Sequence, residues 1–133
     1  MKKWVLLILF IGGGLLLTAC SNGAPQIDLE VAVIDFGEVV NGEIVSRDVL
    51  VHNTGDAELI VDSVSTSCGC TSATLDPMTI LAGETGNLHI EMDTGAHGPE
   101  LTGSLVRQVF LTSNDATQPE ADVELTVFIL ERP

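Results

Sequence analysis

The chain has 133 residues, of which 45% are hydrophobic and 4% aromatic, and its 19 acidic residues outnumber its five lysines and arginines. Lys2 and Lys3 precede every acidic residue, so the remainder sets three arginines (Arg47, Arg107 and Arg132) against 19 acids, a formal net charge of −16. Such a surface repels phosphate groups, which excludes nucleic acid as a partner. The charge mainly serves solubility, and recruitment of a basic partner or of divalent cations is the alternative.

A short positive region and an apolar run open the chain. Lys2 and Lys3 precede Trp4, and apolar residues interrupted by three glycines continue to Leu17. This is the layout of a secretory signal. As a helix the run would cover about 21 Å, short of the ~30 Å hydrocarbon core of a bilayer. A cleaved signal is therefore favoured over a permanent membrane span.

The apolar run ends in Leu17-Thr18-Ala19-Cys20, which resembles the lipobox of bacterial lipoproteins. In that class the cysteine is acylated and becomes the first mature residue, and two acyl chains give a durable anchor where one binds only marginally. The resemblance implies a signal peptide at 1–19, lipid attachment at Cys20 and a polar tether at 20–26. We expect export and anchoring of the chain to the bacterial cell membrane through Cys20, or to the outer membrane in a bacterium with two membranes. An ordinary secretory signal is the alternative.

Beyond the tether the chain reads as short strands separated by glycine and polar turns, without a helical period. Alternation is clearest at 88–92 and 123–129, and Asn41-Gly42 and Asn53-Thr54-Gly55-Asp56 are turn signals. The expected strands are 31–36, 44–52, 59–64, 71–75, 88–92, 105–112 and 123–129. About seven strands predict one all-β domain at 27–133, an antiparallel β-sandwich.

Several short motifs occur in the order found in one bacterial family. They are Phe36-Gly37-Glu38-Val39, Asn53-Thr54-Gly55-Asp56, Leu59-Ile60-Val61, Cys68-Gly69-Cys70-Thr71, Ala82-Gly83-Glu84 and Ser113-Asn114-Asp115. Over residues 31–130 the chain resembles the domain of unknown function 1573 family, and Cys68-Gly69-Cys70-Thr71 is the most specific motif. The chain departs from the family at Ala82, where proline is usual. The resemblance implies an immunoglobulin-like sandwich but no agreed activity, so function has to be argued from the site.

Cys68 and Cys70 are the one constellation in the sequence that could carry chemistry. With Cys20 acylated and the domain exported, two thiols remain in a compartment that permits disulfides. On an extended strand, residues i and i+2 have Cα atoms ~6.6 Å apart, near the upper limit for a disulfide, and Gly69 allows the chain to pinch. So small a ring stabilises a fold weakly, and strained or exposed disulfides are readily reduced. A redox-active pair and a purely structural turn both remain open.

Two thiolates on one face also suit a soft metal ion, with copper or zinc as the possible cofactor. Zinc normally takes four ligands, and the chain offers no second cysteine pair. We expect His89 on the outward face of its strand, His97 in a glycine-rich loop and Met92 in the core. The sequence brings none of the possible additional ligands near the pair; they are His52, His89, His97, Met78 and Met92.

No hydrolase elbow, phosphate loop or zinc-protease motif is present in the sequence, so we expect no enzyme. The sequence favours a lipid-anchored, non-catalytic binding or assembly module that contacts another envelope protein, with exposed strand edges as one route to pairing. The alternative is a thiol-disulfide redox or soft-metal handling protein that acts through Cys68 and Cys70.

Overall fold

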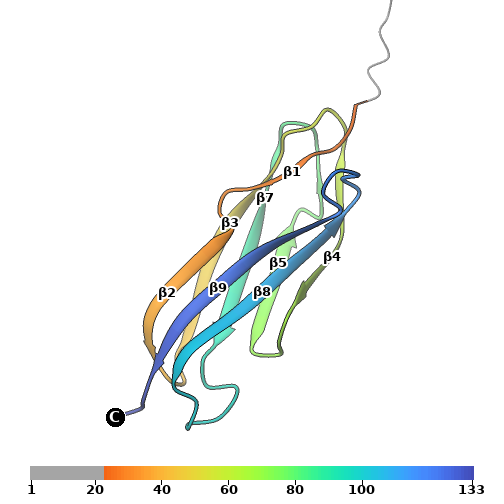
Figure 1. The fold of residues 1–133 in the computed structure, drawn as a ribbon. Coiled ribbons are helices and arrows are strands. Elements are labelled where there is room, and N and C mark those ends of the chain that lie inside the picture. The colour runs from red at the N-terminus through yellow and green to blue at the C-terminus, as the bar shows by residue number, and fades with distance from the viewer. Residues whose placement is uncertain (1–22) are drawn as a thin grey trace, which may run out of the picture.

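The computed structural model describes residues 23–133, which form two β-sheets packed face to face (Figure 1). The strands are β1 (Ile27–Leu29), β2 (Val33–Val40), β3 (Ile44–Asn53), β4 (Leu59–Thr66), β5 (Thr71–Asp76), β6 (Thr79–Ile80), β7 (Thr85–Asp93), β8 (Gly103–Ser113) and β9 (Glu120–Leu130). One sheet has the order β1-β3-β7-β5 and the other β2-β9-β8-β4-β6. The expected all-β, immunoglobulin-like sandwich is confirmed.

The described part of the chain begins after the expected anchor. The predicted signal peptide at 1–19 and Cys20 lie outside the described residues, as does the first part of the predicted tether. Between residues 23 and 133 there is no helix with the length and apolar character needed to cross a membrane.

The described residues form nine strands where about seven were expected. The additional strands, β1 and β6, have three and two residues, too few to show a periodic pattern. β2 pairs with β9 in parallel, and its register shifts between Asp35 and Glu38. Gly37, at the shift, has φ +70°, a left-handed conformation that glycine adopts without steric cost. The remaining pairings are antiparallel, as the sequence predicted.

Alternate side chains of the strands fill the space between the sheets. In β7 every second residue is buried, and these are Gly86, Leu88, Ile90 and Met92. In β9 the buried set is Ala121, Val123, Leu125, Val127 and Ile129. Burying a large aliphatic side chain contributes about 1.5–3 kcal/mol, so this single layer is the main source of stability. Met92 lies in the core, as expected.

Two buried polar side chains organise the end of the sandwich where the described chain begins. Asp115 accepts hydrogen bonds from the backbone N–H of Ile27 at 2.9 Å and from Thr117 and Gln118 across its own turn. Asn53 donates through Nδ2 to the carbonyl oxygens of Ala57 and Ile80. These bonds join β1 to the turn between β8 and β9, and the turn between β3 and β4 to β6.

The end of the predicted tether is part of this arrangement. The carbonyl oxygens of Ala24 and Gln26 accept hydrogen bonds from the backbone N–H groups of Asp56 and Thr54, each at 2.9 Å. Residues 24–26, at the end of the expected tether, are therefore bonded to the folded domain. The polar composition of the segment does not reveal these bonds because they are made by its backbone.

The buried carboxylate of Asp115 makes the free energy of unfolding depend on pH in the acid range. The hydrogen bond from Ile27, together with those from Thr117 and Gln118, lowers the pKa of Asp115 from 3.8 to about 2. The folded state therefore gains stability above pH 3.8 and loses that gain as the pH falls through 2. We expect Asp115→Asn to lower the free energy of unfolding at pH 7 by about 2 kcal/mol, measured by urea denaturation.

The same titrations at pH 2–4 should show a weaker acid dependence for Asp115→Asn than for the native chain. Asp122→Asn, at an exposed position of β9, is the matched control and should keep the native acid dependence. Equal pH profiles for Asp115→Asn and the native chain would contradict the prediction.

Candidate functional site

The Cys68-Gly69-Cys70 turn lies at the end of the sandwich opposite residue 23 (Figure 1). It connects β4 of the five-stranded sheet to β5 of the four-stranded sheet. The loop 94–102, which connects β7 to β8, lies at the same end, as does the C-terminus. Two segments that are distant in sequence therefore meet at this end.

Cys68 and Cys70 form a disulfide, with their Cα atoms 5.4 Å apart. Gly69 is exposed, and a Cβ built on it would meet no atom within 4 Å. Its backbone is not in the left-handed region, so the pinch of the chain does not depend on glycine-specific angles as the sequence suggested. The two cysteines differ in access, because Cys70 is buried at 5% exposure while Cys68 is half-exposed.

Hydrogen bonds from both sheets hold the turn. The hydroxyl of Thr66 bonds to the carbonyl oxygens of Cys68 and Thr71 at 2.9 and 3.0 Å, and the N–H of Asp93 donates to the carbonyl oxygen of Cys70 at 2.8 Å. The N–H of Cys70 also donates to the Sγ of Cys68 at 3.1 Å. The backbone that carries the two sulfur atoms is thus fixed, and the Sγ of Cys68 already accepts a hydrogen bond.

Asn41 fixes the loop 94–102 that faces this turn. Its side chain is buried, and its Nδ2 donates to the carbonyl oxygens of Gly98 at 2.9 Å and Leu101 at 2.8 Å. The Nε of Arg132 donates in turn to the Oδ1 and the backbone oxygen of Asn41. The loop therefore has a defined path although it contains two glycines and little secondary structure.

Thr94 fixes the start of the same loop. Its buried hydroxyl accepts a hydrogen bond from the N–H of Gly42 at 3.0 Å and donates to the carbonyl oxygen of Glu43 at 2.8 Å. In the sequence, Asn41-Gly42 is visible only as a turn signal. The Asn41-Gly42 turn also holds the loop 94–102, which lies more than 50 residues away in the sequence. This contact depends on the packing of β2 and β7, which belong to different sheets.

His97 lies in this loop and meets the cysteine pair. One of its ring nitrogens and the Sγ atoms of Cys68 and Cys70 all lie within 4.8 Å of one another. The side chain of His97 is exposed, as expected for a residue of a glycine-rich loop. The structure therefore supplies the third potential ligand that the sequence could not select.

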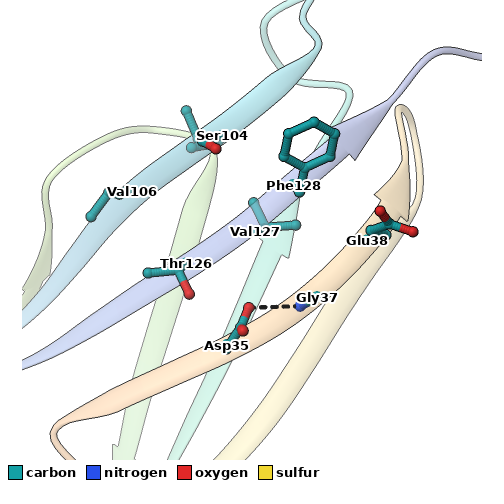
Figure 2. Close-up of a pocket in the computed structure, with 9 residues that line it drawn as sticks. Asp35, Gly37, Glu38, Ser104, Val106, Thr126, Val127 and Phe128 are labelled. Atoms are coloured by element: carbon teal, nitrogen blue, oxygen red, sulfur yellow. Dashed lines mark hydrogen bonds between the residues drawn. The ribbon is translucent and has the colours of Figure 1, made fainter.

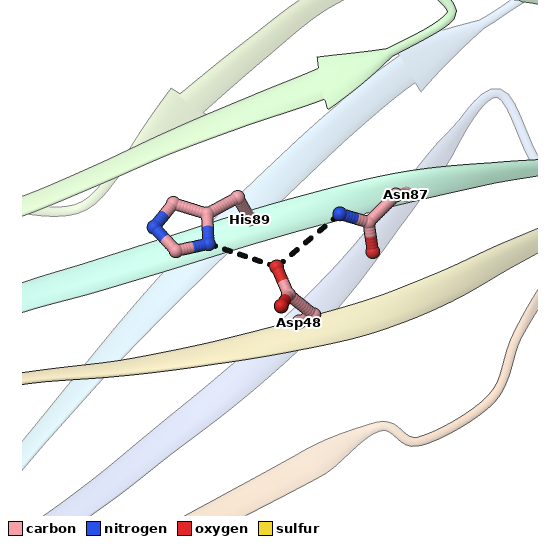
Figure 3. A network of polar contacts seen from close by, with 3 residues as sticks. All are labelled: Asp48, Asn87 and His89. Carbon is pink, nitrogen blue, oxygen red and sulfur yellow. Dashed lines mark hydrogen bonds and ion pairs between the residues drawn. The ribbon is translucent and has the colours of Figure 1, made fainter.

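The other two histidines are bonded elsewhere. His52 contacts the hydroxyl of Thr85 at 3.0 Å. His89 is exposed on the outward face of β7, as expected, and its Nδ1 lies 2.8 Å from the Oδ1 of Asp48 (Figure 3). Hydrogen bonds from His89 and Asn87 lower the pKa of Asp48. Neither His52 nor His89 joins the cysteine pair.

Arg107 is the cation closest in register to the cysteines. The ladder between β4 and β8 continues past Thr66 through bonds between Ser67 and Gln108, which brings Arg107 to the level of Cys68. Arg107 pairs with the buried Leu125, and its Nε is buried without a hydrogen-bond partner among the described residues. In the sequence, Arg107 is visible only as one of three arginines.

A shallow groove of about 370 Å³ lies on the outer face of β2, β8 and β9, in the same half of the domain (Figure 2). Phe128 and Val106 project from neighbouring strands there and are 46% and 52% exposed. The carboxylates of Asp35 and Glu38 lie along the β2 side. The groove thus combines an apolar centre with an acidic margin.

The fold and the cysteine turn define a small immunoglobulin-like sandwich domain that carries a Cys-x-Cys pair at one end. The model of the family described as "Protein of unknown function (DUF1573)" matches residues 27–128, and the chain belongs to that family. A search of curated proteins found no match.

Solved structures show the same fold. A protein of unknown function from Porphyromonas gingivalis W83 is 20% identical with a TM-score of 0.68, over 78% of this chain and 46% of that one. The PapD-like domain 7 of human CEP192 is 10% identical with a TM-score of 0.61, over 83% and 89%. The Vibrio cholerae VesB protease is 15% identical with a TM-score of 0.61, over 79% and 32%. The chain spans less than half of the P. gingivalis protein, and these likenesses concern the fold alone.

The role of Asn41 in holding the loop can be tested by substitution. Asn41→Ala removes both hydrogen bonds to the loop carbonyls and one acceptor of Arg132, so we expect a loss of about 2 kcal/mol in the free energy of unfolding. Backbone amides of residues 94–102 should exchange faster in hydrogen-exchange mass spectrometry. Asn87→Ala, which removes an exposed bond to Asp48, is the control and should change stability by less than about 0.5 kcal/mol. Unchanged exchange in the loop would show that Asn41 does not hold it.

Proposed function

We propose that the chain is a lipid-anchored envelope protein that acts as a non-catalytic binding or assembly module. Cys20 attaches it to the membrane, and the domain presents its far end to a partner protein. This is supported by the distance between the end of the sandwich where the described chain begins and the end that could bind a partner. The described chain starts at one end of the sandwich, whereas the cysteine turn and the loop 94–102 lie at the opposite end (Figure 1). The groove at Phe128 lies beside the last residues of β9, a strand that runs toward that opposite end.

The length of the domain sets the distance between the anchor at Cys20 and the far end, where the cysteine turn lies. β9 has 11 residues and runs toward the far end, which at ~3.3 Å per residue is about 35 Å. Two residues separate Cys20 from Gly23, and the carbonyl oxygens of Ala24 and Gln26 are bonded to the sandwich. An anchor at Cys20 therefore keeps the entry end near the bilayer and directs the far end away from it.

The groove indicates the chemistry of the partner. Exposed aromatic and aliphatic side chains are frequent anchors of protein interfaces, and Phe128 and Val106 form such a pair. Asp35 and Glu38 border them, and the domain as a whole is strongly acidic. The fitting partner surface is an apolar projection flanked by Lys or Arg, which the acidic domain would also attract over longer distances.

Site-directed photo-crosslinking in cells tests the proposal. A benzophenone amino acid placed at Phe128 or Val106 should give a discrete protein adduct, because these side chains lie at the centre of the display surface. Ile60 is the matched control, since it is 41% exposed in β4 near the entry end and should give none.

The same strain with Cys20→Ser tests the anchor, and this form should move to the soluble fraction and lose the adduct. Full membrane retention of the processed Cys20→Ser protein would contradict the lipid anchor. Adducts only at Ile60, or none at any position, would contradict presentation of the far end.

Thiol-disulfide exchange is a second candidate function, and the unequal access of the two cysteines favours it. An external thiolate can reach the half-exposed Cys68 more easily than the buried Cys70. Attack on the Sγ of Cys68 breaks its bond to Cys70 and forms a mixed disulfide, while Cys70 leaves as a thiolate. A second thiol of the same partner then attacks, which releases Cys68 as a thiolate and leaves the partner oxidised.

Trapping of the mixed disulfide tests this candidate. With Cys70→Ser, the thiolate of Cys68 should attack the disulfide of an oxidised partner, which releases one partner sulfur as a thiolate and leaves a covalent adduct that a reductant cleaves. No internal thiol remains to displace the partner. With Cys68→Ser, the remaining Cys70 is buried and should give at least about tenfold less adduct. Non-reducing gels followed by mass spectrometry measure both. Equal adducts from the two variants, or none from either, would contradict exchange through Cys68.

A further inference from the structure

We propose that the reduced cysteine pair and His97 together form a Cu(I)-binding site. Three soft or borderline ligand atoms, Sγ of Cys68, Sγ of Cys70 and a ring nitrogen of His97, already lie within 4.8 Å of one another. They come from the turn between β4 and β5 and from the loop between β7 and β8, so the folded domain brings them together. The proposal uses the cysteines of the second candidate function but does not depend on exchange with a partner.

The donor set selects the metal. Thiolates favour Cu(I) and zinc among the common ions, and imidazole suits both metals. Structural zinc sites are almost always four-coordinate and closed by protein ligands, whereas Cu(I) is satisfied with fewer ligands. Two thiolates and one imidazole match Cu(I), and the described residues place no further His, Cys, Asp or Glu in this cluster.

The surroundings support thiolate ligands. The N–H of Cys70 donates to the Sγ of Cys68 at 3.1 Å, and the hydroxyl of Thr71 lies 3.6 Å from the Sγ of Cys70. Donors to the ligand atoms orient them and stabilise their negative charge. Two thiolates with one Cu(I) carry a net charge of −1, and the strand register places the backbone of one cation, Arg107, at the level of Cys68.

The side chain of His97 can reach the metal without a change in the backbone of its loop. Asn41 holds the loop at the carbonyl oxygens of Gly98 and Leu101, so the backbone next to His97 is fixed. Gly98 has φ +94°, which only glycine adopts easily, and the imidazole itself is exposed. The side chain can therefore rotate onto an ion that arrives from solvent without a change in the fold.

Oxidation state controls the site. A dithiol donor passes two electrons and two protons to the bond between Cys68 and Cys70, is itself oxidised to a disulfide, and leaves two thiols. Binding of Cu(I) then displaces the two thiol protons, and the imidazole of His97 binds as a neutral ligand. In the disulfide state neither sulfur is a thiolate, so the site is closed to the ion.

Competition with a chromophoric Cu(I) chelator tests the site. The full chain in detergent, reduced by a phosphine without oxygen, should take one Cu(I) from bathocuproine disulfonate, while the oxidised chain should take none. His97→Ala should weaken the affinity about tenfold or more. His52→Ala, at a histidine bonded to Thr85, is the matched control and should bind as the native chain does. X-ray absorption should show sulfur and nitrogen ligands in the native chain and loss of the nitrogen in His97→Ala.

Native affinity in His97→Ala with an unchanged absorption spectrum would overturn the role of His97. Absence of Cu(I) binding by the reduced chain, equal binding by the oxidised chain, or displacement of Cu(I) by equimolar zinc would overturn the site as a whole. A circular dichroism spectrum is recorded for each variant, and Cys68→Ser with Cys70→Ser, which should abolish binding, serves as a second test if His97→Ala fails to fold. These outcomes are independent of the crosslinking experiment, so the copper site and the partner-binding function can fail separately.

Discussion

Burial of alternate residues between two sheets is the constraint on which the rest of this structure depends. Each strand gives one face to a single apolar layer, as Leu88, Ile90 and Met92 do in β7. Polar chemistry cannot be placed in that layer without a large desolvation cost. It is therefore confined to the outer faces and to the ends, where the chain passes from one sheet to the other. The cysteine turn is such a crossing.

The two ends of the sandwich use similar buried polar side chains for different purposes. At the entry end, Asp115 and Asn53 satisfy backbone groups of β1 and of neighbouring turns, which joins the start of the domain to its body. At the far end, Asn41 and Thr94 satisfy the loop that carries His97. Because such groups are costly to bury unpaired, each of these contacts also specifies one path for the chain. Buried polar contacts thus hold the loop with His97 as well as the start of the domain.

The far end combines a place for a partner with a place for chemistry. The groove beside Phe128 and the cysteine turn lie in the same half of the molecule. In our proposals, reduction of the pair and the arrival of an ion change the charge of this surface. Partner binding, thiol exchange and copper binding are thus separate hypotheses about one region. Cys68 and Cys70 carry thiol exchange and copper binding, His97 carries copper binding alone, and Phe128 and Val106 carry partner binding.

The sequence by itself determined the sandwich, because alternation of apolar residues is a local property that shows in any strand of sufficient length. It also identified the Cys68 and Cys70 pair, the exposed His89 and the buried Met92. It did not show β1, β6 or the parallel pairing of β2 with β9, since very short strands have no period and alternation does not encode the partner strand. Only the tertiary structure placed His97 beside the cysteines and Arg107 at the level of Cys68. Those proximities depend on how two sheets pack and on which loops share an end, and no local pattern carries that information.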